Sequence, residues 1–124
     1  VLDIGLLCAM SDLDALTILK GNELFVEFKG ALTEQYVLQQ IICDTNYTPY
    51  YFGTDKSTFE QDFIIQKEND VVPIEVKSST NVRSQSLKAF FEKYNPKTSV
   101  RFSLLPYQEQ SWMQNIPLYA ICNL

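Results

Sequence analysis

The chain has 124 residues, 46% of them hydrophobic and 13% aromatic, a formal net charge of −5 and no histidine. This length suits one domain of about 100–150 residues, and the composition is typical of a folded globular protein, not a disordered one. The absence of histidine excludes Ser-His triads and histidine metal sites. The acidic balance disfavours unassisted nucleic-acid binding, because neutralisation of phosphates dominates that affinity. Any chemistry must therefore come from carboxylates, Lys, Tyr or Cys.

The three cysteines, Cys8, Cys43 and Cys122, are widely spaced, lie in apolar contexts and form no CxxC pair. This pattern predicts buried, reduced thiols instead of disulfides or a zinc site. No apolar run approaches the roughly 20 residues of a membrane span, and no signal-peptide pattern opens the chain. The sequence therefore predicts a cytoplasmic protein without a membrane partner.

The beginning of the chain predicts a short helix over residues 3–10 and a second amphipathic piece over 13–19. The chain starts without Met, inside what reads as a structured segment. We therefore expect a carboxyl-terminal domain of a longer protein, with residues 1–20 as the linker and 21–124 as the domain.

Residues 23–42 are the clearest predicted helix, with Gly21 and Asn22 as the stop and N-cap before it. The apolar residues expected on its buried stripe are Leu24, Phe28, Ala31, Leu32, Leu38 and Ile42. Glu34 does not fall on the polar side but on the flank of this stripe. We therefore expect Glu34 to be partly buried, either as an edge residue or as part of a site.

Residues 48–53 read as a first strand, and residues 60–67 and 71–77 as two more strands joined by a turn around 68–70. A two-residue loop at 69–70 would place Asp62 opposite Lys77, and a loop at 68–69 would place it opposite Glu75. Both registers put Asp62, Glu75 and Lys77 on one face of the sheet, whereas a three-residue loop would not.

Two carboxylates beside an apolar hairpin are costly unless they have partners. Carboxylate oxygens with a backbone carbonyl suit Mg²⁺ or Mn²⁺, and Lys77 could then orient or help deprotonate an attacking water. The simpler interpretation is an exposed, charged hairpin edge with an ordinary Glu–Lys pair.

The remaining pattern predicts a helix over 84–94, a strand on which Val100, Phe102 and Leu104 alternate, a loop over 106–115 and a last strand over 117–121. The order helix, three strands, helix, strand predicts a mixed α/β sheet with the Glu34-bearing helix packed on it.

The spacing Asp62-(x)12-Glu75-x-Lys77 resembles motifs II and III of the PD-(D/E)xK nuclease superfamily, whose restriction-endonuclease-like core has the order α-β-β-β-α-β. The resemblance implies Asp62, Glu75 and the Val76 carbonyl as metal ligands for Mg²⁺ or Mn²⁺, with Lys77 positioning water. Glu34 matches the acidic residue of motif I, with Glu27 in reserve, and would hold a second-shell water or a second metal.

A narrower resemblance rests on six segments that occur in order: residues 3–7, 21–27, 59–64, 73–79, 94–96 and 116–120. Together they look like the uncharacterised domain that follows the P-loop module in a family of prokaryotic AAA-type ATPases. The chain departs from that pattern where residues 56–59 replace a usual Gly. Glu60 is also an extra carboxylate before Asp62, so Glu60 is an alternative metal ligand.

Two functions follow from these resemblances. The first is a Mg²⁺-dependent phosphodiester hydrolase, nuclease-like, within a larger ATPase. The second is a catalytically silent module that binds nucleic acid or protein on behalf of the ATPase module of the same polypeptide. The complete Asp–Glu–Lys set favours the first, and the acidic composition favours the second.

Overall fold

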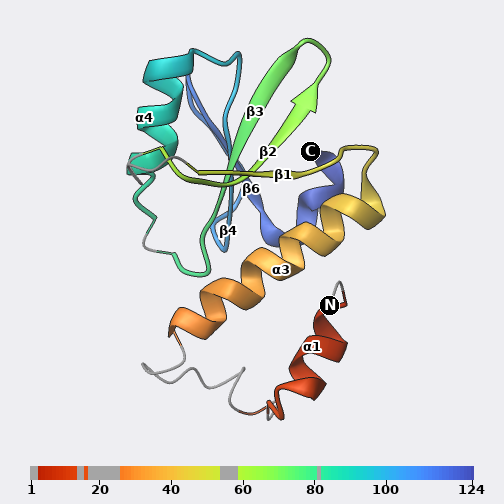
Figure 1. Ribbon diagram of the computed structural model, residues 1–124. Coiled ribbons are helices and arrows are strands. Elements are labelled where there is room, and N and C mark those ends of the chain that lie inside the picture. Colours follow the sequence, from red (N-terminus) through yellow and green to blue (C-terminus); the bar gives the residue numbers. More distant parts are fainter. Residues whose placement is uncertain (1–2, 14–15, 17–25, 54–58, 81) are drawn as a thin grey trace.

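The computed structural model describes residues 3–13, 16, 26–53, 59–80 and 82–124 (Figure 1). Its elements, in chain order, are helices α1 (Ile4–Met10) and α3 (Val26–Asp44), strands β1 (Tyr50–Phe52), β2 (Gln61–Lys67) and β3 (Asp70–Val76), helix α4 (Gln85–Tyr94), strands β4 (Val100–Ser103), β5 (Gln108–Glu109) and β6 (Gln114–Pro117), and the 3₁₀ helix η2 (Leu118–Asn123). Within the described residues no helix is both long enough and apolar enough to cross a membrane.

The strands form one six-stranded sheet in the order β1-β2-β3-β4-β6-β5. Neighbours are antiparallel from β1 to β3, parallel from β3 through β4 to β6, and antiparallel again between β6 and β5. Helix α4 connects the parallel strands β3 and β4. The predicted mixed α/β sheet with flanking helices is therefore confirmed.

The main core lies between α3 and one face of the sheet. The residues of this cluster are all buried: Val37, Ile41, Phe63, Ile65, Val72, Ile74, Val76, Val100, Phe102, Ile116 and Ile121. Because side chains alternate along a strand, Ile64 and Val71 face the other side, where they line a cavity with Phe90 of α4. The two faces of the sheet are thus covered by different helices (Figure 1).

The central hairpin has the register with the two-residue loop at positions 68–69. Lys67 pairs with Asp70, and Phe63 pairs with Ile74. Continued one step further, this register would place Asp62 opposite Glu75, but the regular pairing ends at Phe63 and Ile74, where the pairing of β2 with β1 is also shifted. Glu68 has φ 56°, the left-handed conformation that a two-residue hairpin turn requires at its first central position, and it adopts it without a glycine.

The predicted stripe of the long helix is wrong in part. Ala31 and Ile42 are exposed, whereas Val37 and Ile41 are completely buried. Apolar residues stand side by side at 37–38 and at 41–42, so two stripes about 100° apart on the helix compete, and the sheet chooses between them. The predicted N-cap at 21–22 lies outside the described residues, as does Leu24, and the Phe28 side chain is not described.

The carboxyl-terminal predictions also need correction. The expected loop over 106–115 contains β5 and the start of β6, and the expected strand over 117–121 is mostly the 3₁₀ helix η2. Leu104, expected on a strand, follows the end of β4 and is 54% exposed. Strand β6 was not predicted because it contains polar residues, and its buried Asn115 is of a type that is common in loops.

Near the amino terminus, α1 confirms the helix predicted for 3–10, and Oδ1 of Asp3 caps it by accepting the Leu6 N–H at 2.7 Å. The piece predicted for 13–19 lies mostly outside the described residues. The prediction of buried cysteines is wrong: Cys43 and Cys122 are exposed and Cys8 is half-buried, although all three are free. Cys43 lies beside Ile42 on the exposed side of α3, away from the stripe that packs on the sheet.

Candidate functional site

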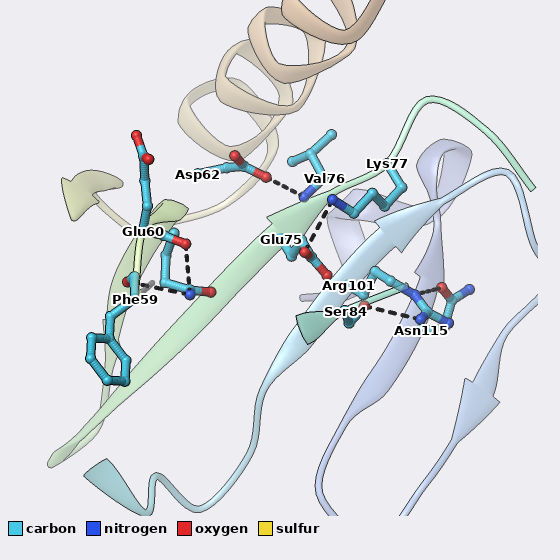
Figure 2. A network of polar contacts seen from close by, with 10 residues as sticks. Phe59, Glu60, Asp62, Glu75, Val76, Lys77, Ser84, Arg101 and Asn115 are labelled. Atoms are coloured by element: carbon cyan, nitrogen blue, oxygen red, sulfur yellow. Dashed lines mark hydrogen bonds and ion pairs between the residues drawn. The ribbon is translucent and has the colours of Figure 1, made fainter. Parts of the chain in front are cut away.

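Strand alternation gathers polar side chains on the face of the sheet opposite the main core. Phe63, Ile74 and Val76 point to the α3 side, so Glu75 and Lys77 of β3 point to the other side. Asp62 does not follow this alternation, because the pairing of β1 with β2 shifts register between Gln61, which pairs with Phe52, and Ile64, which pairs with Tyr50. The regular pairing of β2 with β3 ends at Phe63 and Ile74, one residue before Asp62 and Glu75. Figure 2 shows Asp62 turned toward α3 and the Val76 N–H, while Glu75 points away from it, toward Arg101.

Asp62 takes over a backbone role where the hairpin opens. The regular pairing of β2 with β3 ends at Phe63 and Ile74. Two residues further along β3, the N–H of Val76 donates to Oδ2 of Asp62 at 2.6 Å. Burial raises the pKa of Asp62, and the charges of Glu75 and Glu60 add to this, while the Val76 N–H and Lys77 oppose it. The Asp62 carboxylate is therefore fixed in place, but its negative charge is incompletely compensated.

Glu75 is the most deeply buried acid of the site, with its side chain 7% exposed. Its Oε1 lies 3.1 Å from Nζ of Lys77, and its Oε2 is buried without a hydrogen-bond partner among the residues that the structure describes. The Lys77 backbone is fixed because its N–H donates to the Phe102 carbonyl of β4 at 2.8 Å. An unpartnered, buried carboxylate oxygen is costly, so this side chain lacks one cation or donor.

Glu34 reaches the same cluster from α3. It is half-buried, as predicted from the sequence. Burial raises its pKa, the charges of Asp62 and Glu60 raise it further, and Lys77 opposes them. Helix α3 thus brings Glu34 within electrostatic range of both the hairpin carboxylates and the lysine. The side chain of Glu27 is not described, and Glu60 is exposed.

A second polar group continues the row across the sheet, and the sequence analysis missed it. Arg101 of β4 is the register partner of Glu75, and Asn115 of β6 is the partner of Arg101. Arg101, only 5% exposed, donates from Nε to Oδ1 of Asn115 at 2.8 Å and from Nη1 to Oγ of Ser84 at 3.1 Å. Burial lowers the pKa of Arg101, and the charge of Glu75 opposes this. The sequence feature that could have indicated this network is the position of Arg101 on a strand between Val100 and Phe102, two core residues.

Residues 29–121 match the family described as Domain of unknown function (DUF4143). The chain belongs to the DUF4143 family. The match spans Glu34, Asp62, Glu75 and Lys77 as well as the Arg101 network. No curated protein and no solved structure matches the chain. The family description assigns no activity, so the function of this DUF4143 domain must be argued from the geometry of its site.

The side chains of this DUF4143 domain that could hold a metal are Asp62 and Glu75. Within the described residues, no group of three or more His, Cys, Asp or Glu side chains is arranged to hold a metal ion. Mg²⁺ commonly takes only one or two carboxylates, and completes its shell with water and substrate phosphate. The two carboxylates, with the unpartnered Oε2 of Glu75, fit that demand.

Proposed function

We propose that this DUF4143 domain is a Mg²⁺-dependent phosphodiester hydrolase with a restriction-endonuclease-like fold, which works in the cytoplasm with an ATPase module of the same polypeptide. One observation carries the proposal. Asp62, Glu75 and Lys77 lie close together where the hairpin opens, and within the described residues a buried oxygen of Glu75 lacks a hydrogen-bond partner.

The arrangement of elements supports the same proposal. Helix α3, strands β1 to β3, helix α4 and strand β4 follow one another in the order of the PD-(D/E)xK core, and β3 and β4 are parallel. The residues that resemble motifs II and III lie on β2 and at the end of β3. The residue that resembles motif I lies on the helix packed against that end.

The residues would divide the work as follows. Asp62, Glu75 and the Val76 carbonyl would bind Mg²⁺ or Mn²⁺, which would polarise the phosphate and lower the pKa of a bound water. Lys77, one-third exposed beside Glu75, is placed to hold the attacking water and to balance negative charge on the phosphate. Glu34, half-buried and with a raised pKa, is suited to hold a second water or a proton.

One observation favours the second candidate, a catalytically silent binding module. Nζ of Lys77 already occupies Oε1 of Glu75 at 3.1 Å, so a cation must compete with the lysine for that carboxylate. In a silent domain this ion pair would serve only to close the end of the hairpin.

A cleavage assay with the full polypeptide that carries this domain decides between the two. The substrates are single- and double-stranded DNA and RNA with Mn²⁺, and the variants are wild type, Lys77→Met and Lys67→Met. Loss of a residue that assists proton transfer lowers turnover by about 10²–10⁴-fold, and we expect a loss of that order for Lys77→Met. Lys67, an exposed lysine of the same hairpin on the opposite sheet face, is the matched control and should leave cleavage unchanged.

Cleavage that survives in Lys77→Met would remove Lys77 from the mechanism. If the wild-type polypeptide cuts none of the four substrates, the silent module is the better description.

A further inference from the structure

Positive charge is concentrated on one segment of this acidic chain. Residues 77–97 hold five of the ten Lys and Arg residues but only one of the fifteen Asp and Glu residues. The five cations are Lys77, Arg83, Lys88, Lys93 and Lys97, and the single acid is Glu92. The overall charge of −5 therefore conceals a basic surface on α4 and its flanking loops, which we call the α4 surface.

The two lysines of α4 itself point away from the sheet. Leu87 and Phe90 of α4 are buried against it, whereas Lys88 and Lys93 are exposed. The loop after the helix is held by the Lys97 N–H, which donates to Oδ2 of Asp70 at 2.7 Å. The α4 surface is therefore built on a packed helix with a fixed end.

An aromatic cavity lies next to this surface. It has a volume of about 390 Å³, and its lining includes Phe52, Ile64, Phe90 and Tyr94. Tyr94 is 47% exposed, and its ring is tilted against Phe90 at 4.6 Å and edge-on to Phe52 at 6.1 Å. Nζ of Lys93 lies 5.0 Å from the centre of the Tyr94 ring, so a cation and a ring face stand side by side.

The cavity lies on the sheet face to which Glu75 points. Ile64 follows Asp62 by two residues on β2, which separates their backbones by about 7 Å along the strand. A flexible chain with one unit in the cavity would therefore place its neighbouring unit near Asp62 and Glu75.

We propose that the α4 surface and the aromatic cavity bind a single-stranded polynucleotide, with a base stacked on Tyr94 and the phosphates held by Lys88 and Lys93. This inference rests on the proposed function, for which it specifies the form of the substrate and its path. Aromatic rings combined with a cationic track are the chemistry that binds single strands. The bases of a duplex are stacked on one another and cannot enter such a cavity.

The test measures binding in EDTA, where hydrolysis plays no part. The full polypeptide is titrated into a fluorescent 12-nucleotide DNA, an RNA of the same sequence, the matching duplex and an acidic peptide. We expect the single strands to bind more tightly than the duplex and the peptide. The double variant Lys88→Gln/Lys93→Gln should bind the single strands about tenfold more weakly. The dependence of log K on log salt should flatten by roughly 1.4, or about 0.7 for each phosphate that a lysine no longer neutralises.

Two controls make the test specific. Lys67→Gln removes an exposed lysine from the opposite sheet face and should leave binding and its salt dependence unchanged. Tyr94→Ala should weaken binding roughly tenfold, because stacking on a base is removed, while Tyr94→Phe keeps the ring and should bind as wild type. Thermal unfolding of each variant shows whether it is folded, and the two lysine changes are on the surface.

An unchanged salt dependence in the lysine variant, tighter binding of the duplex, or preference for the acidic peptide would overturn the inference. If binding depends on the α4 surface but the protein does not cleave in Mn²⁺, the proposed hydrolase activity is refuted and the proposed binding surface is retained. If the α4 variants bind as wild type and still cleave in Mn²⁺, the binding surface is refuted and the hydrolase activity is retained.

Discussion

The row of buried polar residues across the sheet has two ends that differ in how completely they are satisfied. At the Arg101 end, Asn115 is fully buried and makes four hydrogen bonds: it accepts from Arg101 and from Ser103, and it donates to the carbonyls of Leu105 and Pro106. At the Asp62 end, an oxygen of Glu75 is buried without a partner, and the pKa of Asp62 is raised.

This difference distinguishes buried polar groups that stabilise the fold from buried polar groups that are available to a ligand. A network in which every group is paired stabilises the fold and holds its strands in register. A cluster with an unpaired oxygen and poorly compensated acids costs stability, and such a cost is typical of sites prepared for a ligand. We therefore expect that removing the charge of Asp62 stabilises the fold, whereas removing a partner from the Arg101 network destabilises it.

The largest effect should come from Asn115→Ala. It would leave the buried Arg101 guanidinium, the Ser103 hydroxyl and two carbonyls without their partner, and we expect a loss of about 3 kcal/mol or more in the free energy of unfolding. Urea denaturation measures it. Asn123→Ala, at an exposed asparagine whose Nδ2 bonds only to the Ala120 carbonyl at 3.3 Å, should change stability by less than about 0.5 kcal/mol. Equal losses in the two variants would contradict the role given to Asn115.

The next effect concerns the ion pair at the other end. Lys77→Met would leave the buried Glu75 carboxylate with neither oxygen partnered, and we expect it to cost about 1–3 kcal/mol. Adding Glu75→Gln should restore most of this loss, because the uncompensated charge is removed. A double-mutant cycle in urea measures the coupling. Lys88→Met, which breaks an exposed pair with Glu92, should cost about 0.5 kcal/mol or less. If Glu75→Gln restores nothing, Glu75 and Lys77 are not coupled.

A smaller effect should appear in the pH dependence of stability. Asp62 and Glu34 have raised pKa values in the folded protein, so folded protein keeps protons that the unfolded chain has already released. Stability should therefore fall as pH rises through the window that begins near the ordinary values of 3.8 for Asp62 and 4.5 for Glu34. Asp62→Asn, which can still accept the Val76 N–H, should be more stable than wild type at pH 7 and lose that advantage near pH 3.

Urea midpoints between pH 3 and pH 8 would show this crossover. Glu68→Gln, at an exposed carboxylate of the hairpin turn, is the control. An advantage of Asp62→Asn that is the same at every pH would mean that burial of the Asp62 charge is not its cause.

The end of the site that was predictable from sequence is the one built on local signals. Strand-forming residues on both sides of a charged turn predict a hairpin, and period-two alternation then places Glu75 and Lys77 on one face. Alternation also predicted Asp62 on that face, but the shifted pairing of β1 with residues 61–64 of β2 could not be foreseen from the sequence. The sequence could not decide between a turn at 68–69 and one at 69–70, because Glu68 adopts a left-handed conformation that is normally indicated by a glycine.

The Arg101 end was not predictable because its cause is not local. Asn115 and Arg101 are buried only because β4 and β6 bring them together, fourteen residues apart in sequence. Without that partner, a strand with the sequence Gln-Asn-Ile-Pro reads as a loop. The rotation of α3 was missed for a similar reason, since adjacent apolar pairs leave the buried face to be decided by the sheet.

The most direct test of the difference between the two ends is calorimetric titration with Mn²⁺ and with Mg²⁺. We predict that wild type binds one cation at the Asp62–Glu75 end, and that Asp62→Ala weakens this binding at least tenfold. Glu60→Ala, which removes an exposed carboxylate two residues away, should bind almost as wild type. Wild type that takes up neither cation, or Asp62→Ala that binds as tightly as wild type, would contradict a metal site at the unsatisfied end of the row.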